Sequence, residues 1–175
     1  MAKIAFTEKQ IEQAKKDLVI LVDSREQKNG HILEYLDKTG IAYRVGKLSY
    51  GDYSFLLPEA AQGHDLTFCQ DIVIERKASL EELSGNLTRE RERFDREFLR
   101  AKADGCKAYL MIEDPGGYSA VIGHKYRTQM NPQAFMASLK TWEGRFDANV
   151  QFIDRQHSGY FILSTFQYYL RQLMK

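Results

Sequence analysis

A short segment near the middle of the chain places an acidic and a basic side chain close together at the end of an apolar run. Residues 72–78 read Ile-Val-Ile-Glu-Arg-Lys-Ala. Because side chains alternate along a β-strand, Val73, Glu75 and Lys77 would share one face, and Arg76 would lie on the other. A carboxylate binds Mg²⁺ or Mn²⁺ through oxygen, and a lysine can orient water and offset phosphate charge. The pattern therefore suits metal-assisted hydrolysis of a phosphodiester bond.

A metal site requires at least one more carboxylate, and Asp52 is the candidate. Asp52 follows Gly51 in a turn, and a strand beside residues 71–77 would bring it across to Glu75. The alternative is an ordinary strand end, at which Glu75 and Lys77 meet solvent and form weak ion pairs. A Glu-x-Lys triplet alone does not separate the two interpretations, because such short motifs are common.

The elements around these residues predict an α/β domain. The 175 residues suit one domain with a single core. Alternation on either side of residues 50–52 predicts a β-hairpin, and the aperiodic residues 58–70 predict a loop. Strands and helices interleave, so we expect a sheet with helices on both faces. The expected helices lie at residues 7–17, 30–39, 88–103, 132–145 and 159–173, with a further helix start at Ser79, and the remaining strands lie at 18–22, 71–77, 108–112 and 150–153.

Four stretches follow one another in an order that matches a known family. They are Val22-Asp-Ser-Arg-Glu26, Leu48-Ser-Tyr-Gly-Asp-Tyr53, Val73-Ile-Glu-Arg-Lys77 and Tyr109-Leu-Met-Ile-Glu113. Over about residues 18–113 the chain resembles the nuclease domain of the XPF-type structure-specific endonucleases, a branch of the PD-(D/E)xK superfamily. Arg93-Phe94 followed by Glu97 is similar to a helix motif that the family usually writes with Arg-Leu and Gln.

The resemblance implies a restriction-endonuclease-like central mixed sheet flanked by helices on both faces. It also implies a Mg²⁺- or Mn²⁺-dependent DNA endonuclease, structure-selective and acting in DNA repair or recombination, that leaves a 5′-phosphate and a 3′-hydroxyl. We expect residues 1–175 to form one nuclease domain, with a core at about 18–155 and no helix-hairpin-helix or helicase domain. Targeting to branched DNA or single-strand/duplex junctions would then come from a homodimer, a partner protein or a basic loop.

The resemblance also implies roles for individual residues. Asp52 and Glu75 correspond to metal ligands, with the backbone carbonyl of Arg76 near the metal. Lys77 corresponds to the catalytic lysine. A catalytically silent DNA-binding or scaffolding subunit is the alternative function, because the family includes inactive members. The presence of both acids together with Lys77 favours the active enzyme.

A supporting cluster of charged residues is implied beside the site. It consists of Asp23, Arg25 and Glu26, in which Glu26 would touch metal-bound water. Arg76 falls on the apolar face of its strand, and a buried guanidinium requires a carboxylate partner. We therefore expect Arg76 to pair with Asp23 or Glu26.

The family's third acidic position is ambiguous in this chain. Counting from Lys77 places Glu81 there, whereas a one-residue insertion would place Glu82 there. Glu82 also has the spacing of a capping box with Ser79, a purely structural role. The sequence leaves both the register and the role of Glu82 open.

Basic residues gather in two further places. On the expected helix at 88–103, one side carries arginines and the other carries Phe94, Phe98 and Ala101. The default interpretation is a solvated face with i,i+4 ion pairs, and the alternative is a helix that contacts phosphate, a role for which Arg93 is the best candidate. The second place is a mixed basic and aromatic segment, either a surface loop or a DNA contact made by Lys125, Tyr126 and Arg127.

The composition excludes several classes of protein. Lys and Arg total 25 against 24 Asp and Glu, so a nucleic-acid site must be a local patch rather than a uniformly basic surface. Two distant cysteines support neither a disulfide framework nor a structural zinc site. The apolar runs are far shorter than the roughly 18 residues of a membrane helix. We expect a cytoplasmic or nucleoid-associated protein that does not bind membranes.

Overall fold

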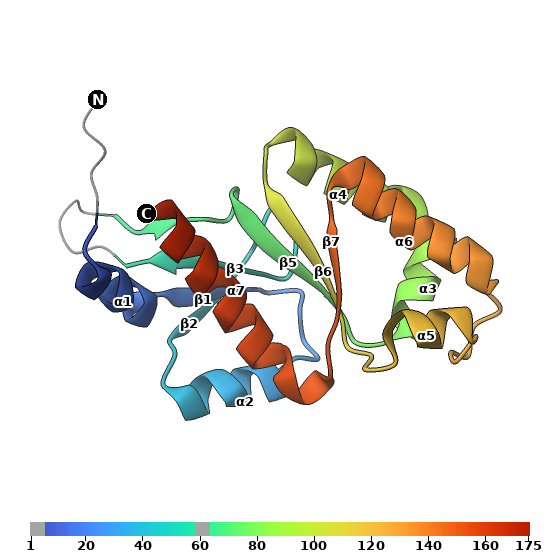
Figure 1. Cartoon of the computed structure of the whole chain (residues 1–175), viewed down its shortest axis with the longest axis horizontal. Helices are drawn as coiled ribbons and strands as arrows, with labels where there is room; N and C mark the ends of the chain where they lie inside the picture. Colours follow the sequence, from blue (N-terminus) through green and yellow to red (C-terminus); the bar gives the residue numbers. More distant parts are fainter. Residues whose placement is uncertain (1–5, 59–63) are drawn as a thin grey trace.

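The computed structural model describes residues 6–58 and 64–175, which form a mixed β-sheet with helices on both faces (Figure 1). The order of the paired strands is β2-β1-β3-β5-β6-β7, and β4 pairs with β3. β1 is parallel to β2 and antiparallel to β3, whereas β5, β6 and β7 are parallel to one another. The strands are β1 (Val19–Asp23), β2 (Tyr43–Gly46), β3 (Tyr53–Leu57), β4 (Leu66–Thr67), β5 (Ile72–Lys77), β6 (Lys107–Ile112) and β7 (Asn149–Phe152).

Two apolar clusters hold the helices against the two faces of the sheet. One cluster packs α3, α4, α5 and α6 on one face, and the other packs α2 and α7 on the opposite face. Burial of these apolar side chains is the main force that fixes the helices to the sheet. The helices are α1 (Glu8–Asp17), α2 (Gly30–Thr39), α3 (Leu80–Arg89), α4 (Arg91–Ala103), α5 (Gly117–Ile122), α6 (Pro132–Phe146) and α7 (Ser158–Leu173), with a 3₁₀ turn η1 (Arg155–His157).

Local capping residues mark several helix ends. Thr7 and Gln10 form a capping box at the start of α1. Gly40 ends α2 in the left-handed conformation, with φ of 68°, which glycine adopts without a steric penalty. The side chain of Asn131 accepts hydrogen bonds from two backbone N–H groups in the first turn of α6. In each case the signal lies within a few residues of the end that it marks.

The predicted β-hairpin is wrong. β2 and β3 do not pair with each other, because β1 lies between them and pairs with both. β1 carries the apolar run at residues 18–22, and a central position buries this strand on both faces. Residues 47–52 therefore cross from one side of β1 to the other, and they deliver Asp52 to the middle of the sheet.

Two further predictions need correction. The helix expected at 88–103 is divided between α3 and α4 at Glu90, whose φ of −121° lies outside the helical region. This change of direction lets the apolar stripes of both helices pack into one core. The predicted loop at 58–70 contains β4, while its residues 59–63 lie outside the described part. A short helix that the sequence did not predict, α5, precedes the mixed basic and aromatic segment.

The helices of the described part include none that is long and apolar enough to cross a membrane.

Candidate active site

The side chains of β5 alternate as predicted. Val73 packs in the cluster with α3 and α4, whereas Ile72 and Ile74 pack in the cluster with α2 and α7. Glu75 and Lys77 follow Val73 on its face, and their relative exposures are only 9% and 8%. The interpretation of this segment as a solvated strand end is therefore wrong. Burying two charged groups is costly unless they are paired, and the Lys77 Nζ lies 2.7 Å from Glu75 Oε1.

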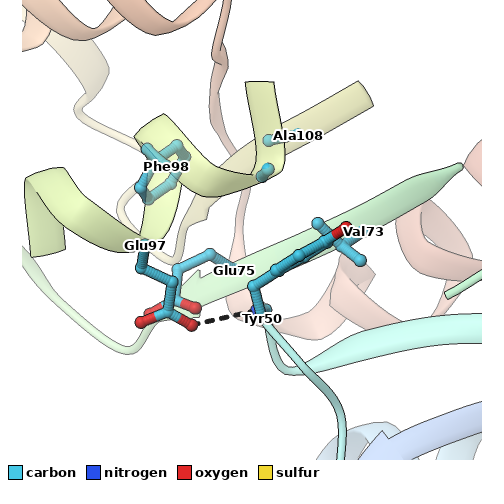
Figure 2. A pocket seen from close by; sticks show the side chains of 8 residues that line it. Tyr50, Val73, Glu75, Glu97, Phe98 and Ala108 are labelled. Carbon is cyan, nitrogen blue, oxygen red and sulfur yellow. Dashed lines mark hydrogen bonds between the residues drawn. The ribbon is translucent and has the colours of Figure 1, made fainter. Parts of the chain in front are cut away.

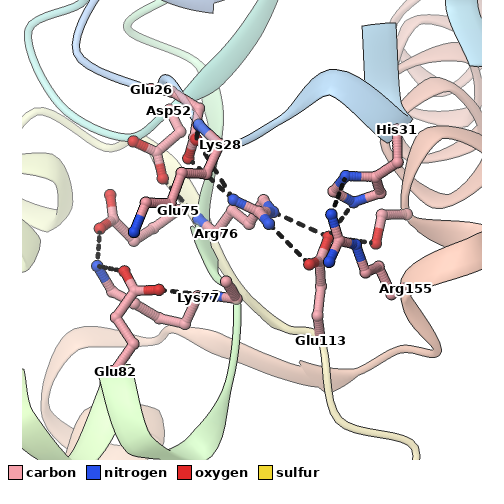
Figure 3. A network of polar contacts seen from close by, with 12 residues as sticks. Glu26, Lys28, His31, Asp52, Glu75, Arg76, Lys77, Glu82, Glu113 and Arg155 are labelled. Carbon is pink, nitrogen blue, oxygen red and sulfur yellow. Dashed lines mark hydrogen bonds and ion pairs between the residues drawn. The ribbon is translucent and has the colours of Figure 1, made fainter. Parts of the chain in front are cut away.

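Backbone pairing brings Asp52 to Glu75, as the sequence predicted. The Asp52 N–H donates to the carbonyl of Ile74, and the Asp52 side chain accepts from the Arg76 N–H at 2.8 Å. Gly51 makes this turn possible, because its φ is 70° and a Cβ there would lie 2.9 Å from the Cβ of Val73. Figure 3 shows the Asp52 and Glu75 carboxylates beside each other above the strand.

Burial and neighbouring charges shift the pKa values of these groups. Burial raises the pKa of Asp52 well above its ordinary value, and the neighbouring Glu75 raises it further. Burial also raises the pKa of Glu75, although Lys77 opposes that shift. For Lys77, burial alone would lower the pKa, but the charge of Glu75 and its hydrogen bond outweigh burial and raise it. Lys77 is therefore positively charged at neutral pH.

An open groove of about 560 Å³ gives access to these groups. Asp52, Lys77, Glu26 and Glu82 are among the residues that line it. The groove is large enough for a nucleotide-sized group, and it is lined by charged rather than apolar side chains. A substrate that fits it must therefore be polar.

Glu81 and Glu82 have different contacts in the structure. Glu82 lines the groove, and its Oε1 lies 3.8 Å from the Lys77 Nζ. Its other carboxylate oxygen accepts from the backbone N–H of Ala78, while its own N–H donates to the Ser79 side chain. Glu81 points elsewhere and accepts from the Arg127 N–H. Glu82 thus caps the start of α3 and faces the site at the same time.

The donor atoms at the groove suit a hard divalent cation. Within residues 6–58 and 64–175 no three His, Cys, Asp or Glu side chains are arranged as a complete metal-binding group. Asp52, which is half-buried, and the buried Glu75 are nevertheless neighbouring carboxylates whose repulsion a cation would relieve. Carboxylate and carbonyl oxygens are the ligands that Mg²⁺ and Mn²⁺ prefer. The residues present therefore fit such an ion, with the Arg76 carbonyl as the predicted additional donor.

Glu97 is a site residue that sequence reasoning missed. It comes from α4, its Oε1 accepts from the Gly51 N–H at 3.2 Å, and its charge helps to raise the pKa of Glu75. Figure 2 shows the Glu97 and Glu75 carboxylates next to each other. The available signal was its alignment with the glutamine of a family motif. Only the packing of α4 over β5 reveals that this position adds a negative charge to the site.

Glu97→Gln should weaken the binding of Mn²⁺ to the protein by on the order of tenfold, because it removes one negative charge close to Glu75. The glutamine Oε1 can still accept from the Gly51 N–H, so the fold should not change. Isothermal titration calorimetry with Mn²⁺ measures the effect, and Glu92→Gln, an exposed change on the same helix, is the matched control. Equal Mn²⁺ affinity in the two variants would contradict a role for the charge of Glu97.

The partner of Arg76 differs in part from the prediction. Its guanidinium forms two hydrogen bonds to Glu113, at 2.8 and 2.7 Å, and a longer contact of 3.3 Å to Glu26. Asp23 instead accepts from the Arg25 side chain and from the backbone N–H of Leu48. Of the two expected partners of Arg76, Glu26 is confirmed and Asp23 is not.

Glu113 is the second residue that was missed, although it ends the fourth family motif. It also accepts from Ser158, and it contacts the imidazole of His31 at 2.6 Å (Figure 3). Burial would raise the pKa of Glu113, but these hydrogen bonds and the charge of Arg76 lower it. The network ties β5, β6, α2 and α7 together directly behind the site.

The predicted DNA contact of Tyr126 is wrong. Its ring is buried against Phe135, and its hydroxyl donates to the Met130 carbonyl. A ring in that position offers no free face on which a base could stack. Lys125 and Arg127 are exposed, and their role in DNA binding stays a prediction.

Comparisons with known proteins agree with this fold. The family model described as the ERCC4 domain matches residues 22–165. A comparison with curated protein sequences gives no match. Among solved structures, XPF from Aeropyrum pernix is similar with a TM-score of 0.64 and 18% identity over 89% of this chain. The same protein in complex with DNA is similar with a TM-score of 0.63 and 17% identity over 88% of this chain. The chain spans 66% of the length of each, and at these identities the likeness concerns the fold.

Proposed function

The chain belongs to the ERCC4 domain family, a family of structure-specific DNA nucleases, and we propose that it is a divalent-metal-dependent DNA endonuclease. One observation carries this proposal: Asp52, Lys77 and Glu82 line one polar groove, and the buried Glu75 pairs with Lys77 beside it. An inactive subunit would have no chemical need for two neighbouring carboxylates next to a lysine.

In the proposed reaction, Asp52 and Glu75 hold Mg²⁺ or Mn²⁺ together with the backbone carbonyl of Arg76. When bound, the ion supplies Lewis-acid stabilisation of the charge that develops on the phosphate. The water oxygen forms a bond to phosphorus and loses a proton to solvent, while the bond from phosphorus to the 3′ oxygen breaks and that oxygen takes up a proton from solvent. The products are a 5′-phosphate and a 3′-hydroxyl.

Lys77 is proposed to act as a cation and hydrogen-bond donor. In the metal-free protein the charge of Glu75 and its hydrogen bond raise the pKa of Lys77, which favours the protonated form. The Glu75 carboxylate at 2.7 Å and the Phe94 ring at 4.7 Å hold the ammonium in place. It is positioned to orient the attacking water and to offset negative charge on the phosphate.

The proposed substrate is branched DNA or a junction of single-stranded and duplex DNA, cut during repair or recombination. The fold neighbour in complex with DNA supports a DNA substrate. The charged lining of the active-site groove favours a phosphate-bearing ligand, and it does not distinguish single-stranded from duplex DNA. We propose that a second copy of the chain or a partner protein supplies the targeting to a particular junction.

Lys77→Met should lower the rate of DNA cleavage on the order of 10²- to 10³-fold, the usual effect of removing one group that stabilises developing charge. The assay uses purified protein, Mn²⁺ or Mg²⁺, and labelled branched, nicked and single-stranded DNA. Lys38→Met, an exposed change on α2, is the control. Cleavage that is equal in wild type and Lys77→Met would show that the activity comes from another site or from a contaminant.

A further inference from the structure

A second groove adjoins the groove of the active site. It has a volume of about 420 Å³, and its lining includes Arg25, Arg93, Arg96 and Arg100. Arg25 also lines the active-site groove, so the two grooves meet at this side chain. We call the second groove the arginine groove. A ligand in the active-site groove therefore lies next to the arginine groove.

The arginines repeat along one side of α4. Arg96 and Arg100 are four residues apart, which corresponds to about 6 Å along a helix, and Arg93 lies almost one turn before Arg96. This spacing is comparable with that of neighbouring phosphates along a nucleic acid strand. Phe94 and Phe98 occupy the opposite side of α4 and are buried, so the helix is held with its arginine side toward solvent.

Arg93, Arg96 and Arg100 lack the carboxylate partners that a solvated helix face would provide. Among the described residues they form no ion pair, and the sole arginine ion pair on α4 joins Arg91 and Asp95 at 3.7 Å. Arg25, the fourth arginine of the groove, is paired with Asp23. Asp95 is also held by the indole N–H of a tryptophan in α6. Glu97 also lines the arginine groove, but its Oε1 accepts from the Gly51 N–H, and among the described residues it forms no ion pair with an arginine. The expected lacing of this face by i,i+4 ion pairs is therefore largely absent.

An unneutralised basic stripe is notable in a chain whose net charge is +1. Exposed guanidinium groups are suited to phosphate, because their donors match its oxygens. Leu99, which is 47% exposed, lines the same groove and offers an apolar contact for a deoxyribose ring. Each nucleotide of a DNA backbone presents a charged phosphate and a sugar with an apolar face, and the groove offers a partner for each.

We propose that the arginine groove binds the backbone of the DNA strand that is cut, with Arg96 and Arg100 contacting successive phosphates beyond the cleaved one. This inference rests on the proposed function, because it assigns the DNA strand that enters the Asp52 and Glu75 site. Since the contacts are to phosphates, binding through the groove is independent of base sequence.

The test measures DNA binding without cleavage. Fluorescence anisotropy in EDTA with a labelled single-strand/duplex junction compares wild type with the Arg96→Ala/Arg100→Ala double variant over a range of salt concentrations. We expect about tenfold weaker binding, and a slope of log affinity against log salt that is smaller by about one to two, because two phosphate contacts are lost. Arg96→Lys/Arg100→Lys should restore most of the salt slope.

The matched control is Arg44→Ala/Arg171→Ala, which removes the same charge from β2 and α7, outside the core that contains α4. If the two double variants bind DNA equally well and with equal salt slopes, the inference is overturned even if the protein cuts DNA. Tighter wild-type binding to RNA of the same sequence would overturn the assignment to DNA. A third outcome separates the two proposals. If wild type cuts no DNA with Mn²⁺ but Arg96→Ala/Arg100→Ala still loses DNA binding, the arginine groove is supported and the proposed hydrolysis is refuted.

Discussion

Asp52→Asn should reduce DNA cleavage on the order of 10³-fold and, at the same time, make the metal-free protein more stable at neutral pH. Cleavage falls because the substitution removes one of the two carboxylates proposed to hold the metal. Stability rises because the wild-type carboxylate is buried next to Glu75, which raises its pKa. The asparagine oxygen can still accept the hydrogen bond from the Arg76 N–H, so the backbone of the site should keep its arrangement.

The pH dependence of this effect has a definite sign. A carboxyl group whose pKa is higher in the folded than in the unfolded state contributes stability below its unfolded pKa of about 3.9. That contribution is lost as pH rises through the folded pKa. The stabilising effect of Asp52→Asn should therefore be absent in acid and should grow as pH rises toward neutrality.

Thermal unfolding in EDTA across this pH range measures the difference in stability between wild type and Asp52→Asn. The same experiment with added Mn²⁺ measures how much the metal stabilises each protein. Mn²⁺ should raise the melting temperature of wild type more than that of Asp52→Asn, because a ligand stabilises only the state that binds it. Asp37→Asn, an exposed change on α2, is the control. A melting temperature of Asp52→Asn below that of wild type in EDTA at neutral pH would refute the proposed electrostatic strain.

The relation between Glu75 and Lys77 was predictable because it depends on one strand. Alternation within β5 determines which side chains share a face, and the apolar residues before Glu75 indicate that the strand is buried. Asp52 required one long-range assumption, namely that its strand pairs with β5, and the Gly-Asp turn supported it. Local periodicity and one turn were thus sufficient for the central trio.

Relations among elements that are distant in the sequence were not predictable. Glu97 reaches the site only because α4 packs over β5, and Glu113 reaches Arg76 only because β6 pairs in parallel with β5. The false hairpin has the same origin, since alternation shows that two segments are strands but not that β1 separates them. Tyr126 was misjudged because the burial of its ring depends on α6.

The network behind the site should be the most sensitive point of the fold. The side chains of Arg76 and Glu113 are 3% and 1% exposed and form two short hydrogen bonds. Arg76→Ala should lower the free energy of unfolding by about 3–5 kcal/mol, because it leaves the Glu113 carboxylate buried without its cation. The Glu113 pKa is lowered in the fold, so its contribution to stability is present above its unfolded pKa and is lost as pH falls through the folded pKa.

Urea unfolding at neutral pH measures this loss, and a double-mutant cycle separates the ion pair from general damage. The cycle uses the single variants Arg76→Met and Glu113→Leu. The double variant Arg76→Met/Glu113→Leu should lose less stability than the sum of the two single losses, because neither charge is then left unpaired. Arg44→Ala, which breaks the exposed ion pair with Asp65, is the control and should cost less than about 1 kcal/mol. Additive losses in the cycle would contradict a direct interaction between Arg76 and Glu113. Because the Arg76 N–H also holds Asp52, a variant that weakens this network should lose Mn²⁺ affinity together with stability.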